Sequence, residues 1–208
     1  MHRYVTRRLL EGKLIMMLPL YCFPPIDFVA EIIRTPRPMF SLGERFEKQT
    51  YRNRFEIAGA NGQQLLSIPL IHKSTHGSMA EVQIDHHDNW KIKHWRSIET
   101  AYRKSPFFEY YAHHFEPLFK RDYVLISEMN LEALHIIKNV FKIKQEITLN
   151  TEYQPTIEGL SNPITARYNQ VFADKNGFLQ NLSILDLIFN EGPMALDILR
   201  TGENQDSL

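Results

Sequence analysis

The 208-residue sequence has one cysteine, Cys22, and lacks the run of roughly 18–20 apolar residues that a membrane-spanning helix needs. A single thiol excludes an internal disulfide framework and is typical of proteins from a reducing compartment. The 24 basic and 24 acidic residues give a formal net charge of zero, so no field of the whole molecule favours nucleic acid or a membrane surface. Any electropositive site must therefore be local.

Glycine-rich phosphate loops and regularly spaced metal ligands are also missing. No G-x-G-x-x-G motif occurs, so the dinucleotide fingerprint is absent and no motif identifies a cofactor. Asp85-His86-His87-Asp88 and His113-His114 place their side chains on adjacent positions, whereas metal-binding pairs on helices favour a spacing of three or four residues. We therefore expect no metal site. No nucleophile motif is present, which argues against a covalent mechanism.

Length and composition fit a single α/β domain with a mixed sheet. We expect residues 17–200 to form this domain. Residues 1–16, which lack the long apolar core and cleavage site of a signal peptide, are predicted to be an N-terminal extension, disordered or mobile. The polar residues 201–208 are predicted to be a disordered tail.

The domain is predicted to begin with a strand, a tight turn and a helix. Leu18–Phe23 is a short apolar run, Pro24-Pro25 stiffens the turn, and Ile26–Ile33 has helical spacing. This unit opens many α/β ligand-binding domains, in which the ligand lies beyond the carboxyl ends of the strands and close to a helix N-terminus. Met39–Leu42 is predicted to be a second short strand.

A β-hairpin is predicted over Thr50–Leu70, at or near one edge of the sheet. Apolar and polar residues alternate from Tyr51 to Ile57, and the turn residues Gly59–Gly62 follow. Arg52 and Arg54 share one face of the first strand. They either clamp an anion, since guanidinium groups match phosphate and carboxylate, or pair with Glu56 and Glu47.

Two helices separated by Ser105-Pro106 are predicted within Asn89–Tyr111, with Ser105 as the cap of the second. Trp95, Ile98 and Tyr102 have the spacing of a buried stripe. A second stripe carries positive charge through Lys93, Arg96 and Arg103. Beside the aromatic residues 107–111, this stripe suits an anionic, ring-bearing ligand; alternatively it is a solvated surface.

Further elements are predicted along the rest of the chain. They are a strand at Ala80–Ile84, a helix at Ser127–Phe141, a strand at Ile143–Leu149, a loop at Gln154–Arg167, and a closing helix capped by Asn181 or Ser183 and ended by Gly192-Pro193. Ser183 and Asp186 have the spacing of a capping box.

Three segments, taken together, resemble the WbqC-like protein family of bacteria. They are FPPIDF with YRNRFEIAGANG, NWKIKHWRSIETAYRKSPFFEYY, and NQVFADKNGFLQNLSILDLIFNEGP, and the resemblance spans roughly residues 18–200. The family name comes from O-antigen gene clusters, so the resemblance implies a cytoplasmic step that makes or decorates a surface sugar. That step would be the transfer of an acyl or aminoacyl group onto a nucleotide-linked sugar. The chain departs from longer members between Tyr153 and Asn169, which puts substrate contacts from that region in doubt.

The residues that match these motifs are the candidate site. The substrate-binding candidates are Arg52, Asn53, Arg54, Asn89, Trp90, Lys93, Arg96, Tyr102 and Asn181. His94 is the candidate general base, because its ordinary pKa lies near neutrality; alternatively it is a core histidine bonded to backbone.

Three functions remain open on the sequence alone. The first is a transferase that holds a phosphorylated small molecule with Arg52, Arg54, Lys93 and Arg96. The second is a nucleotide- or nucleic-acid-binding protein without catalysis, although zero net charge argues against extended nucleic-acid binding. The third is a protein whose motifs only determine the fold. None of the three involves insertion into a membrane.

Overall fold

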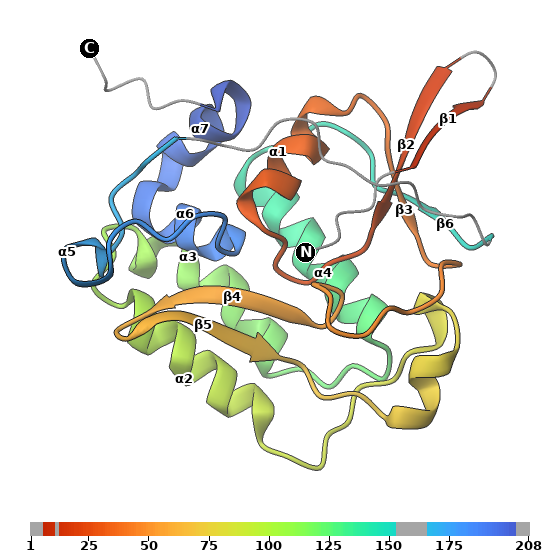
Figure 1. Ribbon diagram of the computed structural model, residues 1–208, viewed down its shortest axis with the longest axis horizontal. Helices are drawn as coiled ribbons and strands as arrows, with labels where there is room; N and C mark the ends of the chain where they lie inside the picture. The colour runs from red at the N-terminus through yellow and green to blue at the C-terminus, as the bar shows by residue number, and fades with distance from the viewer. Residues whose placement is uncertain (1–5, 11–12, 153–165, 203–208) are drawn as a thin grey trace.

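A computed structural model describes residues 6–10, 13–152 and 166–202 of the chain. A four-stranded mixed sheet has the order β1-β2-β3-β6, from β1 (Thr6–Leu10), β2 (Lys13–Pro19), β3 (Pro38–Ser41) and β6 (Thr148–Asn150) (Figure 1). β1 is antiparallel to β2, whereas β2, β3 and β6 run parallel. This arrangement confirms the predicted α/β class with a mixed sheet.

The predicted hairpin is confirmed as β4 (Arg54–Gly59) and β5 (Gly62–Ser67). Its predicted place at an edge of the mixed sheet is wrong, because the two strands form a separate sheet. Other groups occupy the free edge of β4. The Ser183 N–H donates to the Glu56 carbonyl, and the Ala58 N–H donates to the Tyr102 hydroxyl. This edge is therefore paired with a loop and a side chain instead of a strand.

Seven α-helices and four 3₁₀ segments complete the described part of the chain. The helices are α1 (Ile26–Arg34), α2 (Trp90–Tyr102), α3 (Phe108–Phe115), α4 (Ile126–Val140), α5 (Ala173–Asn176), α6 (Ile184–Glu191) and α7 (Ala195–Thr201). The 3₁₀ segments are η1 (His72–His76), η2 (Met79–Glu81), η3 (Glu116–Phe119) and η4 (Gly192–Met194). No helix in these ranges is long and apolar enough to cross a membrane.

Two apolar clusters hold the elements together, and α4 contributes to both. The larger cluster joins α2, α3, α4 and α6 to the hairpin through residues such as Phe55, Phe115 and Phe189. The smaller one lies between the four-stranded sheet, α1 and α4, and includes Leu18 and Leu134. Figure 1 shows α4 between the two sheets, with α2 along the hairpin. The hairpin is thus attached to the sheet mainly through helices.

The predicted opening helix is confirmed as α1, directly after Pro24-Pro25. The predicted strand Leu18–Phe23 is wrong in its bounds, because β2 ends at Pro19 and residues 20–23 are not in a strand. Residues 181–182, far from α1 in the sequence, accept hydrogen bonds from the first N–H groups of this helix. The Ile26 N–H donates to the Leu182 carbonyl, and the Asp27 N–H donates to Asn181 Oδ1 at 3.1 Å. These two donors are therefore used within the fold, and Asn181 caps α1 instead of α6.

Several predicted boundaries are wrong. The predicted strand at Ala80–Ile84 is wrong, because its first two residues belong to η2, where Ser78 and Glu81 form a capping box that starts a 3₁₀ turn. α3 begins at Phe108, two residues after Pro106, since the Phe107 N–H is bound to the Phe189 carbonyl. The last strand is shorter than Ile143–Leu149.

Other predictions fall partly outside the described residues. β1 and the start of β2 lie within the predicted extension 1–16 and pair with each other, so the sheet includes part of it. The remainder of that range, residues 203–208 and most of the predicted loop 154–167 lie outside the described residues. The domain bounds 17–200 stay a prediction.

Candidate functional site

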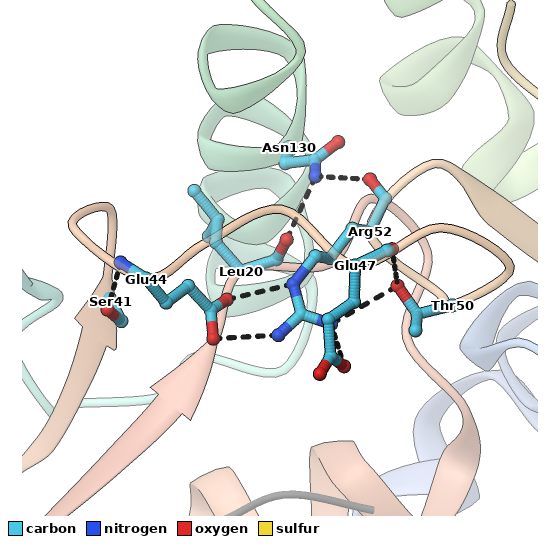
Figure 2. Close-up of polar contacts among 7 residues, drawn as sticks. All are labelled: Leu20, Ser41, Glu44, Glu47, Thr50, Arg52 and Asn130. Carbon is cyan, nitrogen blue, oxygen red and sulfur yellow. Dashed lines mark hydrogen bonds and ion pairs between the residues drawn. The ribbon is translucent and has the colours of Figure 1, made fainter. Parts of the chain in front are cut away.

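Arg52 lies in a buried ion-pair cluster at the carboxyl ends of β2 and β3 (Figure 2). Only 1% of its surface is exposed. Its Nε and Nη2 atoms donate to the two carboxylate oxygens of Glu44 at 2.9 and 2.7 Å, and Nη1 donates to Thr50 Oγ1 at 3.2 Å. Glu47 lies 3.6 Å from Nη1. The guanidinium group is therefore fully engaged within the protein.

The same cluster connects four segments of the chain. Asn130 of α4 donates from Nδ2 to the carbonyls of Leu20 and Arg52 at 2.9 and 2.8 Å, and the Glu44 N–H donates to Ser41 Oγ. Burial raises the pKa of Glu44, and the bonds to Arg52 oppose that shift. Arg52 therefore does not form the predicted anion clamp, because its guanidinium group is bound to Glu44. The pairing alternative applies instead, with Glu44 and Glu47 as partners.

The next two residues, Asn53 and Arg54, lie at the start of the hairpin. Asn53 donates from Nδ2 to the carbonyl of Ile68, the residue that follows β5, at 2.9 Å. Arg54 is half-buried, and its Nε atom is buried without a hydrogen-bond partner in the part of the chain that the structure describes. Asn53 therefore supports the fold of the hairpin.

His94 lies in the core, 8% exposed, between the rings of Phe55 and Trp90 at centroid distances of 5.9 and 5.2 Å. Burial lowers its pKa from 6.5 to about 4, so the imidazole is neutral at pH 7. Among the described residues, His94 Nδ1 and Trp90 Nε1 have no hydrogen-bond partner although both are buried. His94 therefore occupies a core position, as in the alternative interpretation, without the expected backbone bond. Its role as a base stays a prediction.

A cavity of about 210 Å³ lies between the hairpin and α2. We call it the hairpin–α2 cavity. Its lining residues are Gly59, Ala60 and Gln64 from the hairpin and Arg96, Ser97, Thr100 and Ala101 from α2. Gln64 Nε2 lies 3.4 Å from Ser97 Oγ, and Ser97 in turn donates to the Lys93 carbonyl. The cavity thus combines one cation with amide and hydroxyl groups.

The cationic stripe of α2 faces solvent. Lys93, Arg96, Arg103 and Lys104 are exposed, and none of them forms an ion pair within the described ranges. Lys91, by contrast, pairs with Asp122. Of the four cations expected to hold a phosphorylated ligand, Arg52, Arg54, Lys93 and Arg96, only Arg96 lines this cavity. Arg52 is held elsewhere by Glu44.

A second cation, which the sequence reasoning missed, lies at the tip of the hairpin. Lys175 of α5 donates to the Ala60 carbonyl at 2.7 Å and to Asn61 Oδ1 at 3.2 Å, and Asn176 donates to the Gly59 carbonyl. α5 is therefore bound to the rim of the hairpin–α2 cavity. No spacing rule in the sequence connects residue 175 with residue 60.

Tyr102 belongs to a buried polar network around Asp186 of α6. Tyr168 donates its hydroxyl to Asp186 Oδ2 at 2.5 Å, and Gln170 Nε2 donates to the same oxygen at 2.9 Å. Burial raises the pKa of Asp186 to about 6, against the lowering effect of these hydrogen bonds and of the Tyr102 hydroxyl. Asp186 is therefore occupied by tertiary contacts, and the predicted capping box with Ser183 does not form.

The remaining candidates are dispersed. Asn89 is the exposed N-cap residue of α2 and makes no side-chain capping bond, while Asn181 caps α1 from the other end of the sequence. The described residues contain no group of three or more potential metal ligands. The structure therefore brings together Arg96, Ser97 and Gln64, and distributes Arg52, Tyr102 and Asn181 among structural contacts.

Comparisons with known proteins agree with this picture of one family domain. The model of the WbqC-like protein family matches residues 20–162, so the third resembling segment, which begins at Asn169, lies beyond the matched range. The uncharacterized protein Rv1507c of Mycobacterium tuberculosis (strain ATCC 25618 / H37Rv) is 25% identical over an alignment of length 195, and the match covers 75% of this chain and 84% of that protein. No solved structure matches the chain. On the family match, the chain belongs to the WbqC-like protein family.

Proposed function

We propose that this chain transfers an acyl or aminoacyl group onto a nucleotide-linked sugar, as a cytoplasmic step in the synthesis of bacterial surface polysaccharide such as O-antigen. The observation that carries the proposal is Arg96, a guanidinium group without an ion-pair partner among the described residues, in the wall of the hairpin–α2 cavity. Membership of the WbqC-like family supports the link to surface sugars.

The lining of the cavity suits part of such a ligand. Arg96 can donate two parallel hydrogen bonds to a phosphate group, and Ser97, Thr100 and Gln64 can bind sugar hydroxyls. At about 210 Å³ the cavity holds a phosphate and a sugar ring at most. The remaining phosphate and the base would extend along the cationic stripe, where Lys93 and Arg103 lie on the same side of α2 as Arg96.

In this proposal the sugar amine or hydroxyl attacks the acyl carbon of a thioester or ester donor, and His94 accepts its proton. The neutral imidazole has a nitrogen lone pair for this purpose. The bond from the acyl carbon to the donor sulfur or oxygen breaks, and the proton passes to the thiol or alcohol that leaves. His94→Gln should reduce turnover roughly 100-fold or more while ligand affinity stays within a few-fold. Unchanged turnover would assign His94 to the core alone.

Binding can be measured by titration calorimetry with UDP, a UDP-linked amino sugar, acetyl-CoA and a short oligonucleotide. Arg96→Gln should weaken binding of the UDP-linked sugar about tenfold or more, since it removes charge-assisted hydrogen bonds. Arg45→Gln is the matched control, because Arg45 is also an exposed arginine without an ion pair in the described structure, and it lies outside both the cavity and the cationic stripe. Equal effects of the two substitutions would contradict the proposed site.

The second candidate function is binding of a nucleotide or single-stranded nucleic acid without catalysis. It is favoured by the exposed cations Lys93 and Arg96 of α2 and Arg103 and Lys104 just after it, which form no ion pair in the described ranges. Tyr110, which is 71% exposed, could stack on a base. This function predicts oligonucleotide binding that weakens steeply with salt, together with no turnover of any acyl donor.

A further inference from the structure

A larger groove lies at the amino ends of β3 and β6. The Arg52 cluster lies at the other end of the sheet, at the carboxyl ends of β2 and β3. The volume of the groove is about 580 Å³, within the range of roughly 300–1,000 Å³ typical of small-molecule sites. The lining residues are Pro36, Arg37, Pro38 and Met39 on one side and Lys144, Gln145, Glu146 and Thr148 on the other. Because β3 and β6 are parallel neighbours, the loops that lead into them meet at this end of the sheet, in the groove. We call it the amino-edge groove.

Both walls of the groove are held in place by the fold. Arg37 lies between two prolines, whose rings restrict the backbone to a narrow range of φ. Thr35, just before them, closes α1 by donating its hydroxyl to the Glu31 carbonyl at 2.8 Å. On the other wall, Gln145 donates from Nε2 to the Ile33 carbonyl at 2.9 Å. The groove is therefore formed before any ligand binds.

The charges of the groove are available to a ligand. Arg37 and Lys144 are exposed, come from different loops, and form no ion pair or hydrogen bond with the described residues, Glu146 included. Two cations against one carboxylate make the lining net positive. An anionic group therefore fits better than a cationic one.

We propose that the amino-edge groove binds a phosphorylated sugar. Arg37 and Lys144 would contact the phosphate from the two walls, since a phosphate monoester carries close to two negative charges at neutral pH and matches two cations. Glu146 and Thr148 would hydrogen-bond the sugar hydroxyls, and Pro36, Pro38 and Met39 provide an apolar surface for the ring. No lining residue is shared with the hairpin–α2 cavity, so this site does not depend on the proposed transferase function.

The test uses the full chain and titrates glucose 6-phosphate, glucose and inorganic phosphate, by calorimetry and by amide chemical shifts. Glucose 6-phosphate should bind, glucose alone should not, and the shift changes should include residues 36–39 and 144–148. The double variant Arg37→Gln/Lys144→Gln should weaken binding about tenfold or more. Arg45→Gln/Lys73→Gln is the matched control, because it also removes one exposed arginine and one exposed lysine that form no ion pair in the described structure.

Further variants distinguish binding at this groove from binding at the proposed transferase site. Arg96→Gln should leave the glucose 6-phosphate shift changes at residues 36–39 and 144–148 unchanged, and the amino-edge double variant should leave binding of a UDP-linked sugar unchanged. Glu146→Ala should reduce the preference for glucose 6-phosphate over inorganic phosphate. The proposal is overturned if glucose 6-phosphate shows no saturable binding at millimolar concentrations, or if the double variant and its control bind it equally.

Discussion

Asp186 and His94 should shift the stability of the protein in opposite directions as the pH changes. Burial raises the pKa of Asp186 from 3.8 to about 6, so between these values the folded protein keeps a proton that the unfolded chain has lost. Stability therefore falls as the pH rises through this range. Burial lowers the pKa of His94 from 6.5 to about 4, so there the unfolded chain holds the extra proton and stability rises with pH.

The two contributions should be similar in size. Each pKa shift is a little over two units, and one unit corresponds to about 1.4 kcal/mol, so each group contributes up to about 3 kcal/mol. In the wild-type protein the two opposite changes of stability with pH nearly cancel. Single substitutions should reveal them. Relative to wild type, Asp186→Asn should gain up to about 3 kcal/mol as the pH rises from 4 to 7, and His94→Gln should lose about as much.

Urea unfolding at a series of pH values, followed by tryptophan fluorescence, measures these differences directly. Comparing each variant with wild type at the same pH removes the contributions of all other titrating groups, and the constant effect of altered packing appears only as an offset. Opposite slopes for the two variants are the expected result. Differences that stay constant across the pH range, or slopes of the same sign, would refute the assignment of these shifts to burial.

Three further substitutions test the contacts that hold the segments together, each by urea unfolding at pH 7. Arg52→Met should cost about 3–5 kcal/mol, because Glu44 is left buried without its partner, and adding Glu44→Leu should restore much of that loss. Asn181→Ala should cost about 2 kcal/mol, since it removes the acceptor of the Asp27 N–H and places alanine at a φ of 53°, whereas Asn181→Gly should cost less. Gly43→Ala should destabilise the protein, because the new Cβ would lie 2.3 Å from the Thr151 carbonyl oxygen. No rescue by Glu44→Leu, equal losses for alanine and glycine at position 181, or a neutral Gly43→Ala would contradict these contacts.

The local elements were predictable because their signals are local. The period of two between Tyr51 and Ile57 and the turn at Gly59–Gly62 specify a hairpin wherever it is placed, and the helical spacing of Ile26–Ile33 specifies α1. The sheet to which the hairpin belongs depends on what reaches the edge of β4. Those groups are Ser183 and Tyr102, which are distant in sequence. Periodicity carries no information about them.

The candidate site was less predictable for the same physical reason. Arg52 and Arg96 are both arginines within family-like motifs, and both have the chemistry to bind a phosphate. Arg52 is neutralised by Glu44, eight residues earlier in the chain, because a tight loop folds the carboxylate back onto it. Arg96 projects from α2, whose only acidic residue is Glu99. Glu99 does not form an ion pair with Arg96 in the described structure. Whether an arginine is paired with a carboxylate therefore depends on how the neighbouring loops fold.

This difference determines which substitutions report on function. Arg52, Tyr102 and Asp186 are buried and hydrogen-bonded to other parts of the fold, so their loss would unfold part of the protein and lower any activity whatever that activity is. Arg96 is exposed and makes no such contact, so its replacement should leave stability unchanged within about 0.5 kcal/mol. A loss of ligand affinity in Arg96→Gln can therefore be assigned to the hairpin–α2 cavity itself. The same loss in Arg52→Met could not distinguish the removal of a binding residue from the loss of the buried ion pair with Glu44.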